Sequence, residues 1–231
     1  MGIVTHAFNF AYESEPAPGA GLVGYVLNHE RRVYNPPELR GAMFDYVLAS
    51  DGLFLHAKRE ELEVCFPIAS AEVRGLAECF ENFGFDLPKV PEELVCQLCY
   101  RAEEWGKERL ETLFHLVHSP VYPWNDGWEL IEPEQTRTPT SCQPDEPCPS
   151  AERAIIEIHS HHAMPARFSG IDDKDETGFR LYGVIGDLRQ SPSIRMRVGV
   201  YGAGFWEIPA SWALELPAGL RDCNEEEGVD E

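Results

Sequence analysis

The sequence predicts a mixed α+β protein in which a small β-rich region precedes a second, larger domain. Short apolar segments recur along most of the chain and are separated by turns rich in glycine, proline and aspartate, which is typical of strands. One segment differs, because the apolar residues between 92 and 106 recur at helical spacing. With 43% hydrophobic and 11% aromatic residues among 231, the composition favours a folded protein over a disordered one.

Charge and cysteine content narrow the classes of partner and compartment. The net charge of −21 argues against a nucleic-acid backbone or an anionic membrane as the main partner. The N-terminus lacks the basic start and apolar core of a secretory signal, and no apolar run approaches the ~18 residues of a membrane helix. Seven cysteines at irregular spacing fit a reducing cytoplasm better than a disulfide framework. We therefore expect a cytoplasmic protein that binds neither nucleic acid nor membrane.

Residues 1–88 are expected to form a β-rich N-terminal subdomain that carries no chemical motif. A turn-rich leader comes first, and a turn at residues 50–52 joins two apolar segments as a β-hairpin. The predicted elements are a leader over 1–20, a strand pair within 21–34, hairpin strands at 44–48 and 53–56, a third strand at 62–68 and a short helix at 71–83. Prolines within residues 84–91 mark the predicted domain boundary.

Residues 89–215 are expected to form the second domain, beginning with the helix at 92–106. The strands predicted after it lie at 110–117, 128–131, 154–158, 180–185, 194–201 and 205–208, with a helix starting within 169–177. Residues 133–150 are rich in proline, threonine and serine, which predicts an exposed loop of unusual length. The acidic residues 216–231 are expected to be a disordered tail.

The stretch from residue 157 to residue 172 carries the clearest chemistry. His159 and His161 are two residues apart at the end of a predicted strand, so their side chains point to the same face. Asp172 follows, and two imidazoles with one carboxylate make three ligands of a zinc ion whose fourth position stays open. This arrangement is typical of a hydrolase rather than of a structural zinc site.

Several simpler interpretations compete with this one. Ser169 followed three residues later by Asp172 is also a helix-capping pattern, and capping and metal binding are compatible. A metallo-β-lactamase requires Asp-His where Ala163 and Met164 stand, and a cupin requires a glutamate in the region of Pro165. The CxxC pair at residues 96–99 falls in the helical pattern, so we expect it to lie in the core rather than to bind a metal.

His159-Ser160-His161, seven residues, Ser169, two residues and Asp172 together resemble the signature of the JAMM (JAB/MPN) metalloproteases. The resemblance covers residues 89–215 and implies a cytidine-deaminase-like mixed sheet flanked by helices. It implies one Zn²⁺ held by His159, His161 and Asp172, with Ser169 stabilising the tetrahedral intermediate. Glu157, two residues before His159, resembles the sequence of prokaryotic members, whereas His162 stands after His161 where they usually have a proline.

The resemblance also implies a catalytic glutamate on an upstream strand. Glu111 is the expected residue, because it opens the apolar strand after the long helix and precedes His159 by 48 residues. Such a carboxylate takes a proton from the attacking water and passes it to the leaving amine. Glu108 is the competing candidate. Glu157 shares a face with the histidines and is expected to orient one of them or to line the cleft.

The whole chain further resembles a bacterial family, PRTRC system protein A, on residues 49–54, 157–162 and 179–186. That family is encoded beside ubiquitin-like, E2-like and ThiF/E1-like proteins, which are the expected partners. The leading hypothesis is a zinc isopeptidase acting on a ubiquitin-like protein or its conjugate, with residues 133–150 bordering the cleft. The alternatives are a binding or scaffold protein without hydrolysis, and a hydrolase of a small sulfur-carrier-type conjugate.

Overall fold

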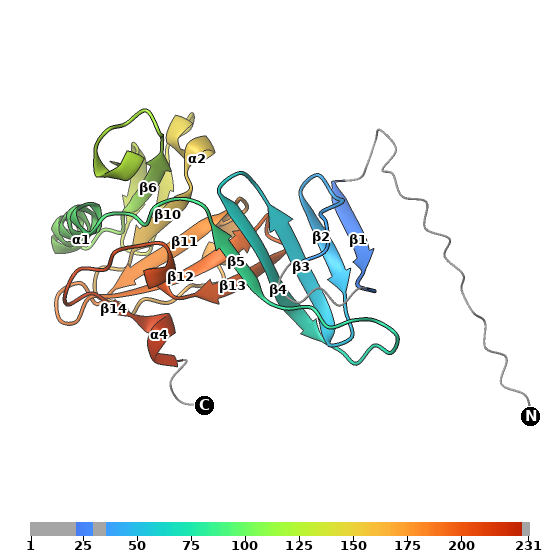
Figure 1. Ribbon diagram of the computed structural model, residues 1–231. Helices are drawn as coiled ribbons and strands as arrows, with labels where there is room; N and C mark the ends of the chain where they lie inside the picture. The colour runs from blue at the N-terminus through green and yellow to red at the C-terminus, as the bar shows by residue number, and fades with distance from the viewer. Residues whose placement is uncertain (1–21, 30–35, 228–231) are drawn as a thin grey trace, which may run out of the picture.

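The computed structural model describes residues 22–29 and 36–227, which form two β-sheets side by side with helices around the second sheet (Figure 1). The mixed α+β class predicted from the sequence is confirmed. The predicted leader over 1–20 lies outside the described residues. Within the described part of the chain, no helix combines the length and the apolar character needed to cross a membrane.

The first sheet is built from five strands in chain order. They are β1 (Val23–Leu27), β2 (Phe44–Leu48), β3 (Gly52–Lys58), β4 (Leu62–Ser70) and β5 (Asn82–Phe85). β1 pairs in parallel with β2, and the other neighbours are antiparallel. The predicted hairpin and third strand are therefore confirmed. Of the strand pair expected within 21–34, β1 is seen, and residues 30–35 lie outside the described part.

The helix expected at residues 71–83 is wrong. This segment is an irregular loop that leads into β5, and its backbone is bonded to the turn between β2 and β3. The Val73 N–H donates to the Ser50 carbonyl, and the Ser50 N–H donates to the Ala77 carbonyl, each at 2.9 Å. Long-range partners thus satisfy backbone groups that a helix would have paired internally. Gly75, at φ +89°, also departs from helical geometry.

The second sheet has seven strands in the order β13-β12-β11-β10-β6-β7, with β14 beside β12. The strands are β6 (Leu113–His118), β7 (Trp128–Ile131), β10 (Ile156–Ser160), β11 (Phe179–Gly186), β12 (Ser193–Val200), β13 (Gly204–Ile208) and β14 (Arg221–Asp222). β10 pairs in parallel with β11 and antiparallel with β6. The six strands predicted between 110 and 208 are all present, with ends shifted by a few residues.

The helices surround this second sheet (Figure 1). They are α1 (Glu92–Lys107), α2 (Pro149–Arg153), α3 (Asp172–Asp175) and α4 (Cys223–Glu227), with short 3-10 turns η1 (Asn125–Gly127) and η2 (Ala210–Trp212). The helix predicted at 92–106 is confirmed as α1, which buries its stripe of Leu94, Val95, Leu98 and Ala102.

Two segments expected to be irregular are ordered. Within residues 133–150, β8 (Gln135–Thr138) and β9 (Ser141–Pro144) form a β-hairpin, so the long loop is largely structured. The acidic tail is folded as far as residue 227, because β14 pairs with Ser193 and Ile194 of β12. β13 pairs only with Met196–Val200 of β12, which leaves the start of that strand free to bond β14.

The two sheets share one hydrophobic cluster, and a second, smaller cluster lies within the first region alone; it consists of Val26, Val47, Ala49, Phe54, Cys65 and Cys79. The Phe66 ring of β4 stacks on Trp206 of β13 with 5.7 Å between centroids. Arg59 also donates a 2.9 Å hydrogen bond to the Phe179 carbonyl of β11. The passage from β5 to α1 does fall within residues 84–91, and buried side chains on both sides of this passage contribute to the shared cluster.

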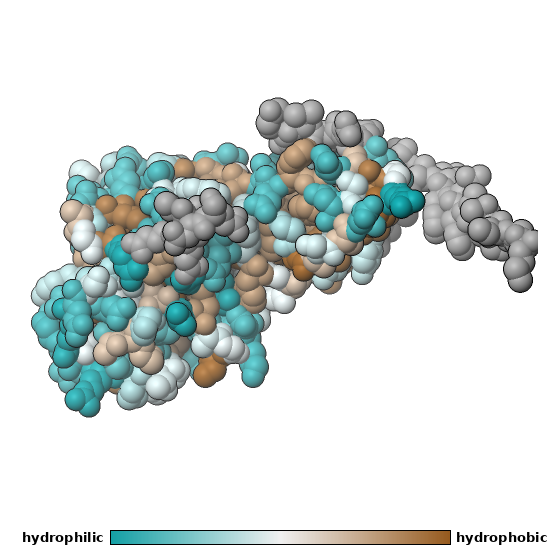
Figure 2. Space-filling view, turned by 90° about the horizontal axis from the view of Figure 1, so that it is seen from below, coloured by the Kyte–Doolittle hydropathy of each residue, from teal (hydrophilic) through white to brown (hydrophobic). Residues whose placement is uncertain are grey.

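The two faces of the second sheet differ in chemistry because side chains alternate along each strand. The face covered by α1 and the first sheet is apolar and includes Phe114, Leu116, Ile156, Ile158, Leu181, Met196 and Val198. The opposite face carries polar residues from the same strands. On the surface view of Figure 2, apolar residues occur in small separate groups among hydrophilic ones, over both sheets.

Candidate metal centre

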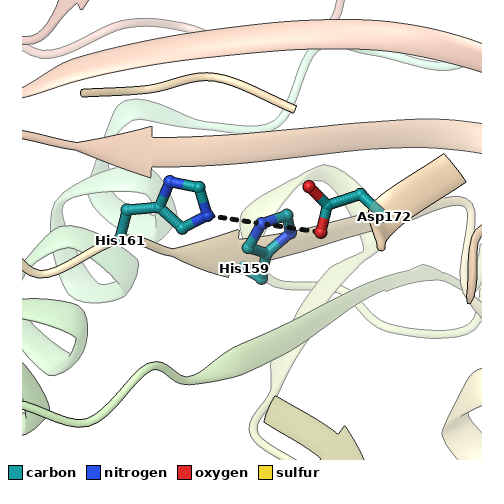
Figure 3. Close-up of side chains that lie close together, drawn as sticks. All are labelled: His159, His161 and Asp172. Carbon is teal, nitrogen blue, oxygen red and sulfur yellow. Dashed lines mark hydrogen bonds and ion pairs between the residues drawn. The ribbon is translucent and has the colours of Figure 1, made fainter. Parts of the chain in front are cut away.

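The motif histidines lie at the end of β10, on the polar face of the second sheet. His159 is within the strand and is 9% exposed, while His161 follows the last strand residue. The His161 N–H donates to the Ile185 carbonyl of β11 at 2.7 Å, which continues the parallel pairing and holds this residue in line. Asp172 reaches them from the first position of α3 (Figure 3). The shared face predicted from the spacing is thus confirmed.

The ligand atoms of these three residues converge on one point. His159 Nε2 lies 3.2 Å from His161 Nε2 and 3.5 Å from Asp172 Oδ1, and all three ligand atoms fall within 4.8 Å of one another. A tetrahedral zinc ion with bonds of ~2.1 Å has ligand–ligand edges of about 3.4 Å. The observed separations match two such edges. The donor set and its spacing therefore fit zinc, with the fourth corner left for water or substrate.

The histidines are prepared to donate lone pairs. His161 Nδ1 lies 3.2 Å from the Pro165 carbonyl, which can only accept a hydrogen bond, so the proton is on Nδ1 and Nε2 faces the site. Burial lowers the pKa of His159 to about 4, against the opposing charge of Asp172. His159 is therefore neutral at pH 7, the form that binds metal.

Ser169 and Asp172 form the hydrogen bonds of the predicted capping pattern, but α3 begins two residues later than that pattern predicts, with Ile171 rather than Ser169 at its N-cap position. The Ser169 hydroxyl accepts hydrogen bonds from the Ile171 and Asp172 N–H groups at 3.2 and 3.4 Å, and the Ser169 N–H donates to Asp172 Oδ2. Asp172 Oδ1 faces His159. One carboxylate oxygen thus completes the cap while the other points to the metal position, so capping fixes the ligand in place.

Glu111 rather than Glu108 approaches the histidines. Glu111 is 3% exposed, and its Oε1 lies 3.9 Å from His161 Nε2. Burial, with a contribution from the charge of Asp172, raises the pKa of Glu111 to about 7. Glu108 is exposed at the end of α1. A carboxyl group of this pKa beside an open coordination position can exchange protons near neutral pH.

Two side chains hold the Glu111 segment against the sheet. The Ser160 hydroxyl accepts from the Thr112 N–H at 3.2 Å, and the Ser160 N–H donates to the Thr112 carbonyl at 2.9 Å. Gln135 of β8 accepts from the Leu113 N–H at 2.7 Å and donates to the Leu113 carbonyl at 2.9 Å, in the manner of a neighbouring strand. Sequence reasoning missed Gln135, because a lone glutamine in a polar segment carries no signal.

The β8–β9 hairpin borders the candidate centre. The Glu111 N–H donates to the Thr138 carbonyl at 3.0 Å, and His162 Nε2 lies 3.2 Å from the Pro139 carbonyl at the hairpin turn. Burial, and then the negative charges of Glu111, Glu157 and Asp172, raise the pKa of the Cys142 thiol in this hairpin. The bordering position expected for residues 133–150 is thus seen, as a hairpin.

Other candidate residues lie outside the ligand group. Glu157 is bonded to Arg180 of β11 at 3.2 Å and approaches His115 of β6 at 3.4 Å, so it lines the polar face of the sheet. In the CxxC pair, Cys99 packs partly against the core, but Cys96 is exposed. The core assignment is therefore wrong for Cys96, which stands on the outer side of α1.

The chain matches no family model, and it matches no curated protein sequence.

Proposed function

We propose that the protein is a zinc-dependent peptidase or isopeptidase that hydrolyses an amide bond at a ubiquitin-like protein or its conjugate. The observation that supports this proposal is the convergence of His159, His161 and Asp172 at zinc-like separations, with buried Glu111 beside the open side. A structural zinc site would fill its fourth position with a protein ligand, whereas three ligands and a neighbouring carboxyl suit catalysis.

The chain supplies the proton transfers of amide hydrolysis. When bound, zinc polarises the scissile carbonyl and lowers the pKa of the attacking water. Glu111 takes the proton from that water and later delivers it to the leaving amine, and its pKa of about 7 allows both steps near neutral pH. Ser169 lies at the start of the ligand helix, where its hydroxyl proton is available to the carbonyl oxygen as negative charge develops.

The macromolecular substrate rests on the sequence resemblance and on one structural feature. Eukaryotic deubiquitinating members of the JAMM family, which this sequence resembles, carry a substrate-contacting insertion between the catalytic glutamate and the histidines. Here the same interval forms the β8–β9 hairpin next to Glu111. After α3, the chain enters β11 at Phe179, so a second long insertion has no room in that interval. Specificity for one type of ubiquitin chain is therefore not part of the proposal.

The test combines metal analysis with a matched pair of variants. Purified protein is expected to contain one zinc per chain and to cleave a ubiquitin-like protein fused or conjugated through its C-terminus. Glu111→Gln is expected to lower kcat by about 10²–10⁴-fold, the usual contribution of a general base, while zinc content is retained. Glu108→Gln, three residues earlier and exposed, is expected to leave kcat unchanged.

Two other outcomes would support the competing functions. Stoichiometric zinc without cleavage, and no effect of Glu111→Gln on any assay, would favour a binding or scaffold protein. Zinc-dependent cleavage of small thiocarboxylate or amino-acid conjugates, with no activity on folded ubiquitin-like proteins, would favour a sulfur-carrier-type hydrolase.

A further inference from the structure

The helix that carries Asp172 cannot hold its own position. α3 has only four residues, far fewer than the roughly 12–15 at which an isolated helix becomes marginally stable. Its backbone bonds are local, because the N–H groups of residues 173–176 donate to carbonyls at residues 169–172. The placement of Asp172 relative to β10 therefore depends on side chains that join α3 to the sheet.

Arg197 of β12 makes this connection. It points from the polar face of the second sheet and is 5% exposed. Its Nε and Nη2 both lie 2.7 Å from Glu176 Oε2, and its Nη1 lies 2.7 Å from Asp173 Oδ1. These carboxylates stand one residue and four residues after Asp172, at both ends of α3. A planar guanidinium is suited to bonding two carboxylates in fixed directions.

Aromatic rings hold the guanidinium itself in place. The Arg197 guanidinium carbon lies 4.0 Å from the centre of the Phe168 ring and 3.8 Å from that of Phe205. Phe168 belongs to the loop before α3 and contacts the His159 ring edge-on at 6.5 Å between centroids. Arg197 thus connects α3, the preceding loop and β13 through cation–π and ionic contacts. Such a set of contacts fixes direction as well as distance.

We propose that Arg197 is a positioning residue that sets the affinity of the centre for zinc by holding Asp172 toward His159. The proposal rests on the metal centre proposed above. Lysine cannot replace Arg197 here, because a single ammonium cannot bond both carboxylates and lie flat between two rings. Residues that support a metal ligand without binding the metal typically change metal affinity by about 10–100-fold when substituted.

The test measures zinc binding to the full chain by competition with a chromophoric chelator. Arg197→Lys is expected to weaken zinc binding by about 10–100-fold. Arg195→Lys is the matched control, because Arg195 lies on the same strand and face and, among the described residues, bonds Glu207 and the Ala166 carbonyl rather than α3. Its zinc affinity is expected to match that of the wild type.

A double-mutant cycle separates positioning from general loss of structure. In an Asp172→Asn background, Arg197→Lys is expected to have no further effect on zinc affinity, because the ligand it positions is gone. The absorption spectrum of the Co²⁺-loaded protein is expected to change in Arg197→Lys toward that of Asp172→Asn. Equal losses in both backgrounds would mean that Arg197 acts on the fold alone, and would overturn the proposal.

The two proposals fail in different ways. Wild-type protein that binds no zinc would remove the metal centre itself. If the wild type binds zinc and Arg197→Lys binds it equally tightly, the metal centre stands and the role proposed for Arg197 is overturned. If Arg197→Lys does not fold, Asp173→Ala decides, because this half-exposed residue is one end of the connection. A several-fold weaker zinc affinity is then expected, and an unchanged affinity would overturn the proposal.

Discussion

Buried histidines face carboxylates in both sheets, and the comparison of His56 in the first sheet with His159 in the second shows which features belong to a candidate metal centre. His56 of β3 is 1% exposed, with Nε2 3.1 Å from Glu63 Oε1, and the other oxygen of Glu63 is bonded by Lys58 at 2.8 Å. His159 lies 3.5 Å from Asp172, and the second group facing it is the His161 imidazole at 3.2 Å.

The two histidine–carboxylate pairs differ in the group beside them, which is Lys58 in the first sheet and His161 in the second. Lys58 brings a positive charge and hydrogen-bond donors to Glu63, so the negative charge of this carboxylate is balanced within the chain. In the second sheet, three electron-pair donors converge, and a cation placed among them would satisfy all three. A histidine–carboxylate pair alone therefore does not indicate a metal site, whereas convergent donors do.

The largest expected effect comes from a matched substitution in the two pairs. His159→Gln is expected to weaken zinc binding by more than about 100-fold, the upper end of what supporting residues produce, because it removes a ligand. His56→Gln is expected to leave zinc affinity unchanged. Titration of both variants against a chelator measures this. Similar losses in the two variants would show that the comparison is wrong.

Gln135→Leu is expected to loosen the hairpin and the Glu111 segment without touching the ligands. It leaves the buried Leu113 N–H and carbonyl without the partners that Gln135 provides, at about 1–3 kcal/mol of unfolding free energy. Urea unfolding measures this loss, and Gln143→Leu on the exposed side of the same hairpin is the control. Zinc affinity is expected to stay within about twofold of wild type, because Gln135 holds the Glu111 segment and contacts none of the zinc ligands. A large drop in zinc affinity would show that Gln135 also supports those ligands.

Ser160 lies between the two motif histidines in the sequence, and Ser160→Ala removes the hydrogen bond that its hydroxyl accepts from the Thr112 N–H. The Thr112 N–H loses the side-chain acceptor while the backbone bond from the Ser160 N–H remains, so about 1 kcal/mol of unfolding free energy is expected. Urea unfolding at constant pH measures the change. A loss of zinc binding larger than the loss of stability would show that Ser160 also orients the histidines.

The smallest effect is a pH dependence that belongs to the first sheet. Burial lowers the pKa of His56 below 6.5, although Glu63 opposes this shift. At a pH between the folded-state pKa and 6.5, the unfolded chain binds a proton at His56 that the folded chain does not. The stability due to neutral His56 is therefore fully present above pH 6.5 and is lost as pH falls through the folded pKa. The slope cannot exceed ~1.4 kcal/mol per pH unit for one proton.

His56→Gln tests this pH dependence. The difference in unfolding free energy between wild type and His56→Gln, followed from pH 8 to pH 5, is expected to shift against the wild type as pH falls below 6.5. A constant difference over this range would mean that folding does not shift the pKa of His56, and a shift in favour of the wild type as pH falls would mean that the ion pair with Glu63 raises that pKa; either result would contradict the prediction.

Local patterns in the sequence were sufficient to predict that His159, His161 and Asp172 come together, and to predict most strands. Alternation along a strand decides that His159 and Glu157 share a face, and the three-residue spacing of Ser169 and Asp172 decides the cap. These are properties of neighbouring residues, so no tertiary contact is needed to infer them. The helical stripe of α1 is local in the same sense.

Tertiary structure decided whatever depended on distant partners. Glu108 and Glu111 are three residues apart, and only the end of α1 and the start of β6 determine which one reaches His161. Residues 71–83 have a composition that permits a helix, but bonds to a turn some 25 residues earlier prevent it. Arg197 joins the ligand helix from a strand 25 residues after Asp172, through a strand register that local spacing does not specify. Long-range pairing selects among conformations that local propensity leaves close in free energy, so these features follow from the folded chain alone.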